Sequence, residues 1–321
     1  MTPRPPPPPR DAPPAGAGAP LREGLLAGVF TERFLVWADE AEWLCSVPGR
    51  LKRDVKPVVG DRVAFAPGPD GTGVVERFLP RETELVRSAA VGRRGERRRT
   101  RPQVLAANVD QLVIVAAVAN PPFRPGLVER LLVAAHRHAL APLLCITKLD
   151  LATPAEVAAL GAPYAALGLP VVGAALEPAP RVAEVAAALA GHTSVLVGHS
   201  GVGKTSLLNA LAHRNLAVGE VGYNRDRGRH TTSMARLVPL QQGGYAIDSP
   251  GVREFTLHGL GPAELALHYP DFAAHRERCG FRDCLHRAEP GCAVRAAAEA
   301  GRIAPHRYAN YLKLLEELLA E

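Results

Sequence analysis

The segment Gly198–Thr205, which reads Gly-His-Ser-Gly-Val-Gly-Lys-Thr, most constrains how this chain can fold. It fits the phosphate-loop pattern G-x-x-x-x-G-K-[ST] without a mismatch, and it follows a strand-like apolar run, Ser194–Val197. Glycines in such a loop let backbone N–H groups curve around phosphate oxygens at a helix N-terminus. The lysine ammonium would pair with the β- and γ-phosphates, and the threonine hydroxyl would bind Mg²⁺. The expected phosphate-site residues are Gly198, His199, Ser200, Gly201, Val202, Gly203, Lys204, Thr205 and Ser206.

A second motif, Asp248-Ser249-Pro250-Gly251, follows the apolar run Tyr245–Ile247 downstream of the phosphate loop. A strand that ends in D-x-x-G suits a nucleotide switch, in which Asp248 holds Mg²⁺ and the Gly251 N–H senses the γ-phosphate. A polar loop lies between the two motifs. Either Thr231 or Thr232 in this loop would coordinate Mg²⁺ when nucleotide triphosphate is bound, and the sequence leaves both open.

A guanine-reading motif, T-K-L-D, follows the apolar run Leu143–Ile146. The Asp150 carboxylate would accept both N–H groups of the guanine Watson–Crick edge, and the Lys148 stem would pack over the base. Thr147 stands where the usual pattern has asparagine, and it lacks the paired donor and acceptor of an amide. Selectivity is therefore expected to rest on Asp150, with Gly173-Ala174 as a backbone turn near the base. The motif precedes the phosphate loop, which reverses the ordinary order and indicates a circular permutation.

Apolar runs of strand length alternate with helix-length segments over residues 109–255. This pattern predicts a mostly parallel sheet with helices on both faces. The expected strands are Leu112–Val118, Leu143–Ile146, Pro170–Ala174, Ser194–Val197, Met234–Leu240 and Gly244–Ile247. The expected helices are Gly126–His138, Pro154–Leu160, Arg181–Ala190 and Lys204–His213.

The region 22–86 contains five short strand-like runs separated by Gly, Pro and Asp turns, after a Pro-rich tail over 1–21 that we expect to be disordered. Five such strands favour a small barrel of the OB-fold type, and a generic β-domain without a ligand is an equal alternative. The runs are Gly24–Phe30, Arg33–Ala38, Glu42–Val47, Asp61–Ala66 and Gly73–Leu79.

An arginine-rich segment follows over 87–108, and we expect a self-repelling linker that either contacts a phosphate backbone or is simply solvated. The net charge of +6 permits a polyanionic partner. The chain has no uninterrupted run of about 18 apolar residues, so a membrane span is not expected.

The last region, 256–321, combines a cysteine–histidine cluster with an amphipathic helical segment, Tyr308–Leu319. Three thiolates and one imidazole suit a closed, tetrahedral structural zinc site, and buried free cysteines are the poorer interpretation. Such a cluster indicates a reducing cytoplasm. The expected ligands are Cys279, Cys284, His286 and Cys292.

These motifs together resemble the ribosome small-subunit-dependent GTPase A family, from about residue 22 to the C-terminus. The resemblance implies an N-terminal OB-fold β-barrel, a central circularly permuted α/β P-loop GTPase domain and a C-terminal α-rich zinc-binding domain. It implies GTP and GDP, Mg²⁺ and one structural Zn²⁺ as cofactors. The matching segments are Gly198–Asn209, His230–Thr232, Asp248–Phe255, the four expected zinc ligands, Ala106–Asp110 and Arg307–Glu317.

The resemblance also implies a role in late maturation of the small (30S) ribosomal subunit, with GTP hydrolysis stimulated by that subunit. The implied partners are the small subunit and 16S rRNA, with no membrane or DNA partner, for a cytoplasmic protein expected to be a monomer. The departures are Thr147 in place of asparagine and the Pro-rich N-terminal extension.

The catalytic water has no evident glutamine to orient it, because Val252 follows the D-x-x-G motif. We hypothesise that His230 takes this role when a partner orders its loop; a solvated histidine or a ribosome contact is the alternative. A metabolic P-loop ATPase or kinase with a structural zinc is the alternative function, and competition between ATP and GTP would separate the two classes.

Overall fold

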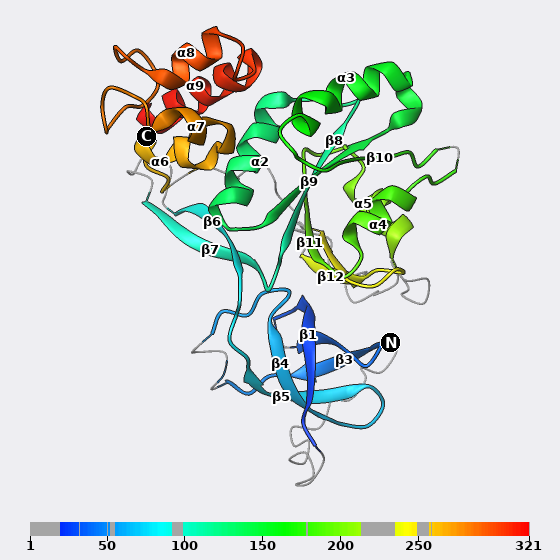
Figure 1. The fold of residues 1–321 in the computed structure, drawn as a ribbon. Helices are drawn as coiled ribbons and strands as arrows, with labels where there is room; N and C mark the ends of the chain where they lie inside the picture. Colours follow the sequence, from blue (N-terminus) through cyan, green and yellow to red (C-terminus); the bar gives the residue numbers. More distant parts are fainter. Residues whose placement is uncertain are drawn as a thin grey trace, which may run out of the picture. The chain divides into compact units, whose positions relative to one another are not determined.

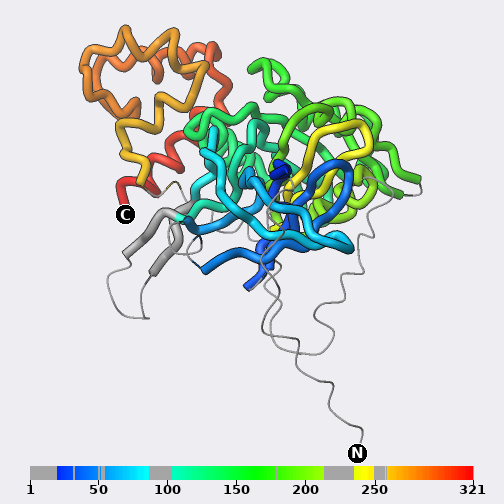
Figure 2. Tube along the Cα trace, turned by 90° about the horizontal axis from the view of Figure 1, so that it is seen from below, coloured from blue at the N-terminus to red at the C-terminus, as the bar shows by residue number. Residues whose placement is uncertain are grey.

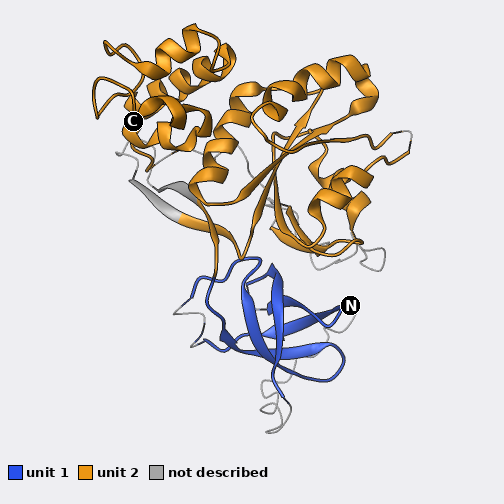
Figure 3. Ribbon diagram, viewed as in Figure 1, with its two compact units in different colours: residues 1–81 blue, residues 82–321 orange. Residues whose placement is uncertain are grey.

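The computed structural model of the 321-residue chain describes residues 20–31, 33–49, 51, 55–91, 99–177, 179–212, 235–248, 257 and 259–320. These residues belong to two compact units, 1–81 and 82–321 (Figure 3). Unit 1 ends at Arg81, whereas the sequence predicted that the barrel domain ends at residue 86. Each unit is described by itself below.

Unit 1 is a closed five-stranded barrel with the strand order β1-β2-β3-β5-β4, in which β4 pairs back to β1 (Figure 1). Inward-facing residues alternate with outward-facing ones along β2, where Phe34, Val36 and Ala38 are buried. The predicted OB-type barrel is confirmed, and each strand lies within two residues of its expected bounds. The strands are β1 (Arg22–Val29), β2 (Arg33–Ala38), β3 (Ala41–Ser46), β4 (Arg62–Pro67) and β5 (Thr72–Phe78).

Unit 2 is built on a six-stranded sheet with the order β10-β9-β8-β11-β13-β12. All neighbouring strands are parallel except β12 and β13, which form an antiparallel edge pair. The mostly parallel sheet predicted from the sequence is confirmed. The strands are β8 (Gln111–Ala117), β9 (Ala141–Thr147), β10 (Val171–Ala174), β11 (Thr193–Val197), β12 (Arg236–Pro239) and β13 (Tyr245–Asp248).

Helices cover both faces of this sheet (Figure 1). On one face, α4 (Ala183–Leu189) and α5 (Lys204–Leu211) pack buried leucine and valine side chains against the strands. The other face carries α2 (Pro125–Arg137) and α3 (Pro154–Ala165). This layering places every βα loop at the carboxyl edge of the parallel strands, where ligands bind in such folds.

The C-terminal part of unit 2 is a small helical module next to α2, and its chain runs from orange to red in Figures 1 and 2. Its core brings together Leu265, Tyr269, Phe272, Tyr311 and Leu315, all at most 1% exposed. The amphipathic segment expected from the sequence lies within α9. The elements are α6 (Pro262–Leu265), η3 (Ala266–His268), η4 (Pro270–Phe272), α7 (Ala273–Arg276), α8 (Ala293–Glu299) and α9 (Pro305–Ala320).

The region 87–108 differs from the predicted linker, because it contributes to a two-stranded antiparallel hairpin of β6 (Glu84–Val91) and β7 (Arg99–Ala107). The linker was predicted from the density of arginines in this region. The hairpin forms instead because buried apolar side chains anchor its base, namely Leu85, Ala106 and Ala107. Residues 92–98, which carry several of the arginines, lie outside the described residues. Across the described parts of the chain, no helix is both long and apolar enough to cross a membrane.

Candidate nucleotide and metal sites

The phosphate loop connects β11 to α5 and has the backbone that its glycines predict. A Cβ atom at Gly198 would lie 2.1 Å from the Val115 carbonyl oxygen, so only glycine fits there. Gly203 has φ of +94° and is the N-cap of α5, a conformation that L side chains rarely adopt. The loop therefore presents backbone N–H groups at a helix N-terminus, which is an anion-binding arrangement.

The Lys204 ammonium lies over the loop. Its Nζ donates hydrogen bonds to the carbonyl oxygens of Gly198, at 2.8 Å, and His199, at 3.0 Å. Burial lowers the pKa of Lys204, and the Asp248 carboxylate opposes this shift. A phosphate oxygen would compete with these carbonyls for the ammonium and would supply the negative charge that they lack.

The structure brings together the phosphate loop and the D-x-x-G strand. Asp248 ends β13, which pairs in parallel with β11, and the Thr205 hydroxyl donates to Asp248 Oδ2 at 3.1 Å. Hydroxyl and carboxylate oxygens are the ligand types that Mg²⁺ prefers. These two side chains, 43 residues apart, are therefore placed to share one cation.

Thr147 lies at the end of β9, is fully buried, and points toward the phosphate loop. Its hydroxyl donates to the Val202 carbonyl oxygen at 2.6 Å, so its one proton is committed to the loop backbone. Asp150, in the short helix η1 (Leu149–Leu151), is exposed instead. Thr147 and Asp150 were both predicted from the sequence to contact the nucleotide. In the structure Thr147 lies behind the phosphate loop and supports its backbone.

The turn after β8 is a part of the site that the sequence did not reveal. Lys148 has a left-handed backbone (φ of +59°), and its Nζ donates to the Asn120 carbonyl oxygen in that turn. Pro121 of the same turn would lie 3.7 Å from a Cβ at Gly201. No local pattern around Asn120 marks this contact, because it depends on β8 lying between β9 and β11.

A cavity of about 610 Å³ opens beside Leu149 and Gly173 and continues between α4 and α5. A Cβ at Gly173 would lie 2.7 Å from Leu149 Cδ1, so the turn expected near the base is closely packed on the guanine-reading motif. His230, Thr231, Thr232 and Gly251 lie outside the described residues, and the structure says nothing of their predicted roles.

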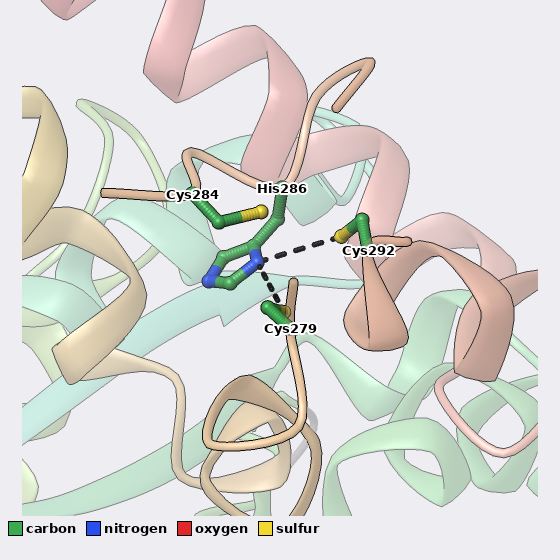
Figure 4. Close-up of side chains that lie close together, drawn as sticks. All are labelled: Cys279, Cys284, His286 and Cys292. Atoms are coloured by element: carbon green, nitrogen blue, oxygen red, sulfur yellow. Dashed lines mark hydrogen bonds between the residues drawn. The ribbon is translucent and has the colours of Figure 1, made fainter. Parts of the chain in front are cut away.

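The four expected metal ligands converge in the C-terminal module, with their ligand atoms all within 4.8 Å of one another (Figure 4). His286 Nδ1 lies 3.5 Å from Cys279 Sγ and 3.6 Å from Cys292 Sγ. A tetrahedral zinc site with Zn–S near 2.3 Å and Zn–N near 2.0–2.1 Å has S–N edges of about 3.6 Å. The donor set and its spacing therefore fit zinc. Burial lowers the pKa of His286, which favours the neutral imidazole that binds metal.

The segment between α7 and α8, which carries all four of these ligands, is held by side chains of the same module. The Glu289 carboxylate accepts backbone N–H groups of Leu285 at 2.7 Å, Arg287 at 2.8 Å and Ala288 at 3.0 Å. From α9, the Tyr308 hydroxyl donates to the His286 carbonyl and the Tyr311 hydroxyl donates to the Leu285 carbonyl. The loop thus has fixed geometry before any metal–ligand bond is counted.

Arg307, one residue before Tyr308 on α9, joins the C-terminal module to the nucleotide-binding part of unit 2. It is 3% exposed, and its guanidinium donates to Glu129 on α2 at 2.5 Å and to both Asp271 oxygens at 2.8–2.9 Å. The same guanidinium lies 4.5 Å from the centre of the Tyr269 ring. Helix α2 begins shortly after the Asn120 turn and packs against α9, so it connects that turn to the C-terminal module.

Comparison with known proteins agrees with this geometry. The sequence model of the RsgA GTPase family matches residues 78–258. "Small ribosomal subunit biogenesis GTPase RsgA" of Gemmatimonas aurantiaca is 38% identical over 292 residues, covering 88% of this chain and 93% of that protein. The protein of the same name from Bordetella pertussis is 42% identical over 306 residues, covering 92% and 96%.

Two solved structures are similar to the whole fold. YjeQ from Thermotoga maritima is 31% identical, with a TM-score of 0.73 and coverage of 94% of this chain and 99% of that one. YloQ, described as a circularly permuted GTPase, is 26% identical, with a TM-score of 0.70 and coverage of 94% and 96%. The metabolic ATPase or kinase alternative is therefore set aside, and the chain belongs to the RsgA GTPase family of circularly permuted GTP hydrolases.

Proposed function

We propose that this protein is a GTP-hydrolysing factor for biogenesis of the small ribosomal subunit, which binds that subunit and its 16S rRNA and hydrolyses GTP faster when bound. The observation that carries the proposal is the joining of a GTPase site and a Cys₃His module through α2 and α9. Relatives of the same architecture are named for small-subunit biogenesis. We place the protein in the cytoplasm as a monomer without a DNA or membrane partner.

At the nucleotide, the P-loop N–H groups and Lys204 bind the phosphates, and Asp150 reads the guanine edge. A Mg²⁺ ion bound with the nucleotide neutralises phosphate charge during hydrolysis. Thr205 and Asp248 would hold it, together with Thr231 or Thr232. Gly251 would respond to the γ-phosphate. A Zn²⁺ ion on the Cys₃His cluster would be structural, because four protein ligands leave no open position.

We assign 22–86 to the OB-fold, 109–255 to the GTPase domain and 256–321 to the zinc domain, with 1–21 as a disordered tail. The arginine-rich segment within 87–108 gives the chain a phosphate-backbone contact. A net charge of +6 favours a polyanionic partner of this kind.

Co-sedimentation with purified small subunits tests the proposal. The protein should pellet with the subunit in the presence of a non-hydrolysable GTP analogue, less so with GDP, and binding should weaken steeply as salt rises. Binding that is absent with the analogue, or indifferent to the nucleotide, would leave only a GTPase with another partner.

A further inference from the structure

The loop between the first two zinc ligands exposes an aromatic side chain. Phe281 is 50% exposed, although aromatic residues usually contribute most of their area to a core. It is absent from both the buried residues and the partly buried residues of the module core, which does include the neighbouring ligands Cys279 and Cys284. Phe281 therefore does not explain how the module folds.

Hydrogen bonds hold the same loop in place, which makes this exposure significant. The Gly280 N–H donates to the Gly291 carbonyl oxygen at 3.2 Å, and this bond ties the Phe281 loop to the segment that leads into Cys292. The Glu289 carboxylate fixes the intervening turn through three backbone N–H groups. A side chain on such a loop loses little conformational freedom when a partner covers it.

Arginines outnumber acids in the segment that immediately surrounds Phe281. Residues 276–287 contain four arginines against two acids, a net of +2, and three of these arginines are exposed. Arg282, next to Phe281, is exposed and makes no hydrogen bond or ion pair with any residue that the structure describes. An unstacked base can stack on the Phe281 ring while its phosphate pairs with the Arg282 guanidinium. An acidic partner would use only the guanidinium, and a purely apolar partner would use only the ring.

We infer that Phe281 and Arg282 form a contact surface for an RNA, in which an unpaired base stacks on Phe281 and the adjoining phosphate pairs with Arg282. This assignment rests on the proposed function, because it names the part of the zinc domain that touches the ribosomal RNA. It adds a base contact to the electrostatic attraction that the overall charge provides.

Three substitutions of the full-length protein separate an RNA base from a protein pocket. Phe281→Leu keeps apolar volume and removes the aromatic face, Phe281→Trp enlarges that face, and Leu267→Ala is the matched control. Leu267 is 57% exposed in η3 of the same module. Zinc content of each variant is measured first, and it should equal that of the wild type because these side chains lie outside the module core.

Affinity for the small subunit is then measured with the GTP analogue. Stacking on one base is worth about 1–3 kcal/mol, so Phe281→Leu should bind about 5- to 150-fold more weakly, with Phe281→Trp and Leu267→Ala close to wild type. Arg282→Gln should lower the slope of log affinity against log salt by about one.

The opposite pattern, with leucine tolerated and tryptophan disruptive, would identify an apolar protein pocket and overturn the RNA assignment. Unchanged affinity for all variants would overturn the contact surface while leaving the proposed function intact. Failure of the wild-type protein to bind subunits would instead overturn the proposed function, and this assignment with it.

Discussion

Replacing Arg307 with methionine should destabilise unit 2 by about 3–5 kcal/mol at neutral pH, because it removes one partner of a buried ion pair. Glu129 is fully buried, and its Oε1 already has no hydrogen-bond partner among the described residues. Burial raises the pKa of Glu129, and Arg307 opposes this shift. Without the guanidinium, the carboxylate is left as an unpaired buried charge.

The size of the effect follows from what Glu129 can do in the variant. Taking up a proton relieves the charge, and at about pH 7.5 this costs up to about 4 kcal/mol, since the ordinary Glu pKa is about 4.3 and each unit is worth about 1.4 kcal/mol. The wild type already bears part of this cost, because the pKa of Glu129 is raised to about 7 in the intact protein. At about pH 5 the same step costs about 1 kcal/mol. A carboxyl whose folded-state pKa is raised weakens the fold most above that pKa, so the loss should shrink as the pH falls.

Urea denaturation followed by far-UV circular dichroism measures this loss, because helices α2 to α9 all lie in unit 2. The double variant Glu129→Leu with Arg307→Met should recover part of the stability, because it removes the fully buried charge of Glu129 and leaves the Asp271 carboxylate, whose side chain is 16% exposed, without its partner. A loss below about 1 kcal/mol at neutral pH, or a loss that does not change with pH, would show that the variant leaves no unpaired buried charge on Glu129.

Three further outcomes follow from the sites. Thr147→Val removes the donor to the Val202 carbonyl, so a fluorescent GDP analogue should bind about tenfold more weakly; equal affinity would contradict the supporting role. Glu289→Gln should weaken zinc binding about 10- to 100-fold in competition with a chelator, whereas the exposed control Glu299→Gln should not. Equal zinc affinities for the two variants would contradict the role of Glu289 in holding the ligand loop. His230→Ala should keep GTP affinity and lose subunit-stimulated turnover, and full stimulation would reject the catalytic hypothesis.

Local pattern was sufficient for much of the fold. Strand β2 was predicted at its observed bounds because its buried residues alternate, and α9 followed from helical spacing of its apolar side chains. The Cys₃His cluster was also recognisable, because its four residues lie close together in the sequence, within Cys279–Cys292. In these cases the information is contained within one segment.

The hairpin of β6 and β7 and the ion pair of Glu129 with Arg307 were not predictable in this way. Strands β6 and β7 form because their apolar ends pack into unit 2, which outweighs the repulsion expected from the arginines. Glu129 and Arg307 are 178 residues apart, and their pairing depends on α9 packing against α2. Thr147 likewise faces Val202 only because β9, β8 and β11 are neighbours in the sheet.

The rate of GTP hydrolysis with and without small ribosomal subunits tests whether the subunit activates this GTPase. We expect slow turnover by the free protein, since no glutamine follows the D-x-x-G motif, and a large increase when subunits are added. Equal rates in the two conditions, under salt concentrations at which the protein binds the subunit, would contradict it.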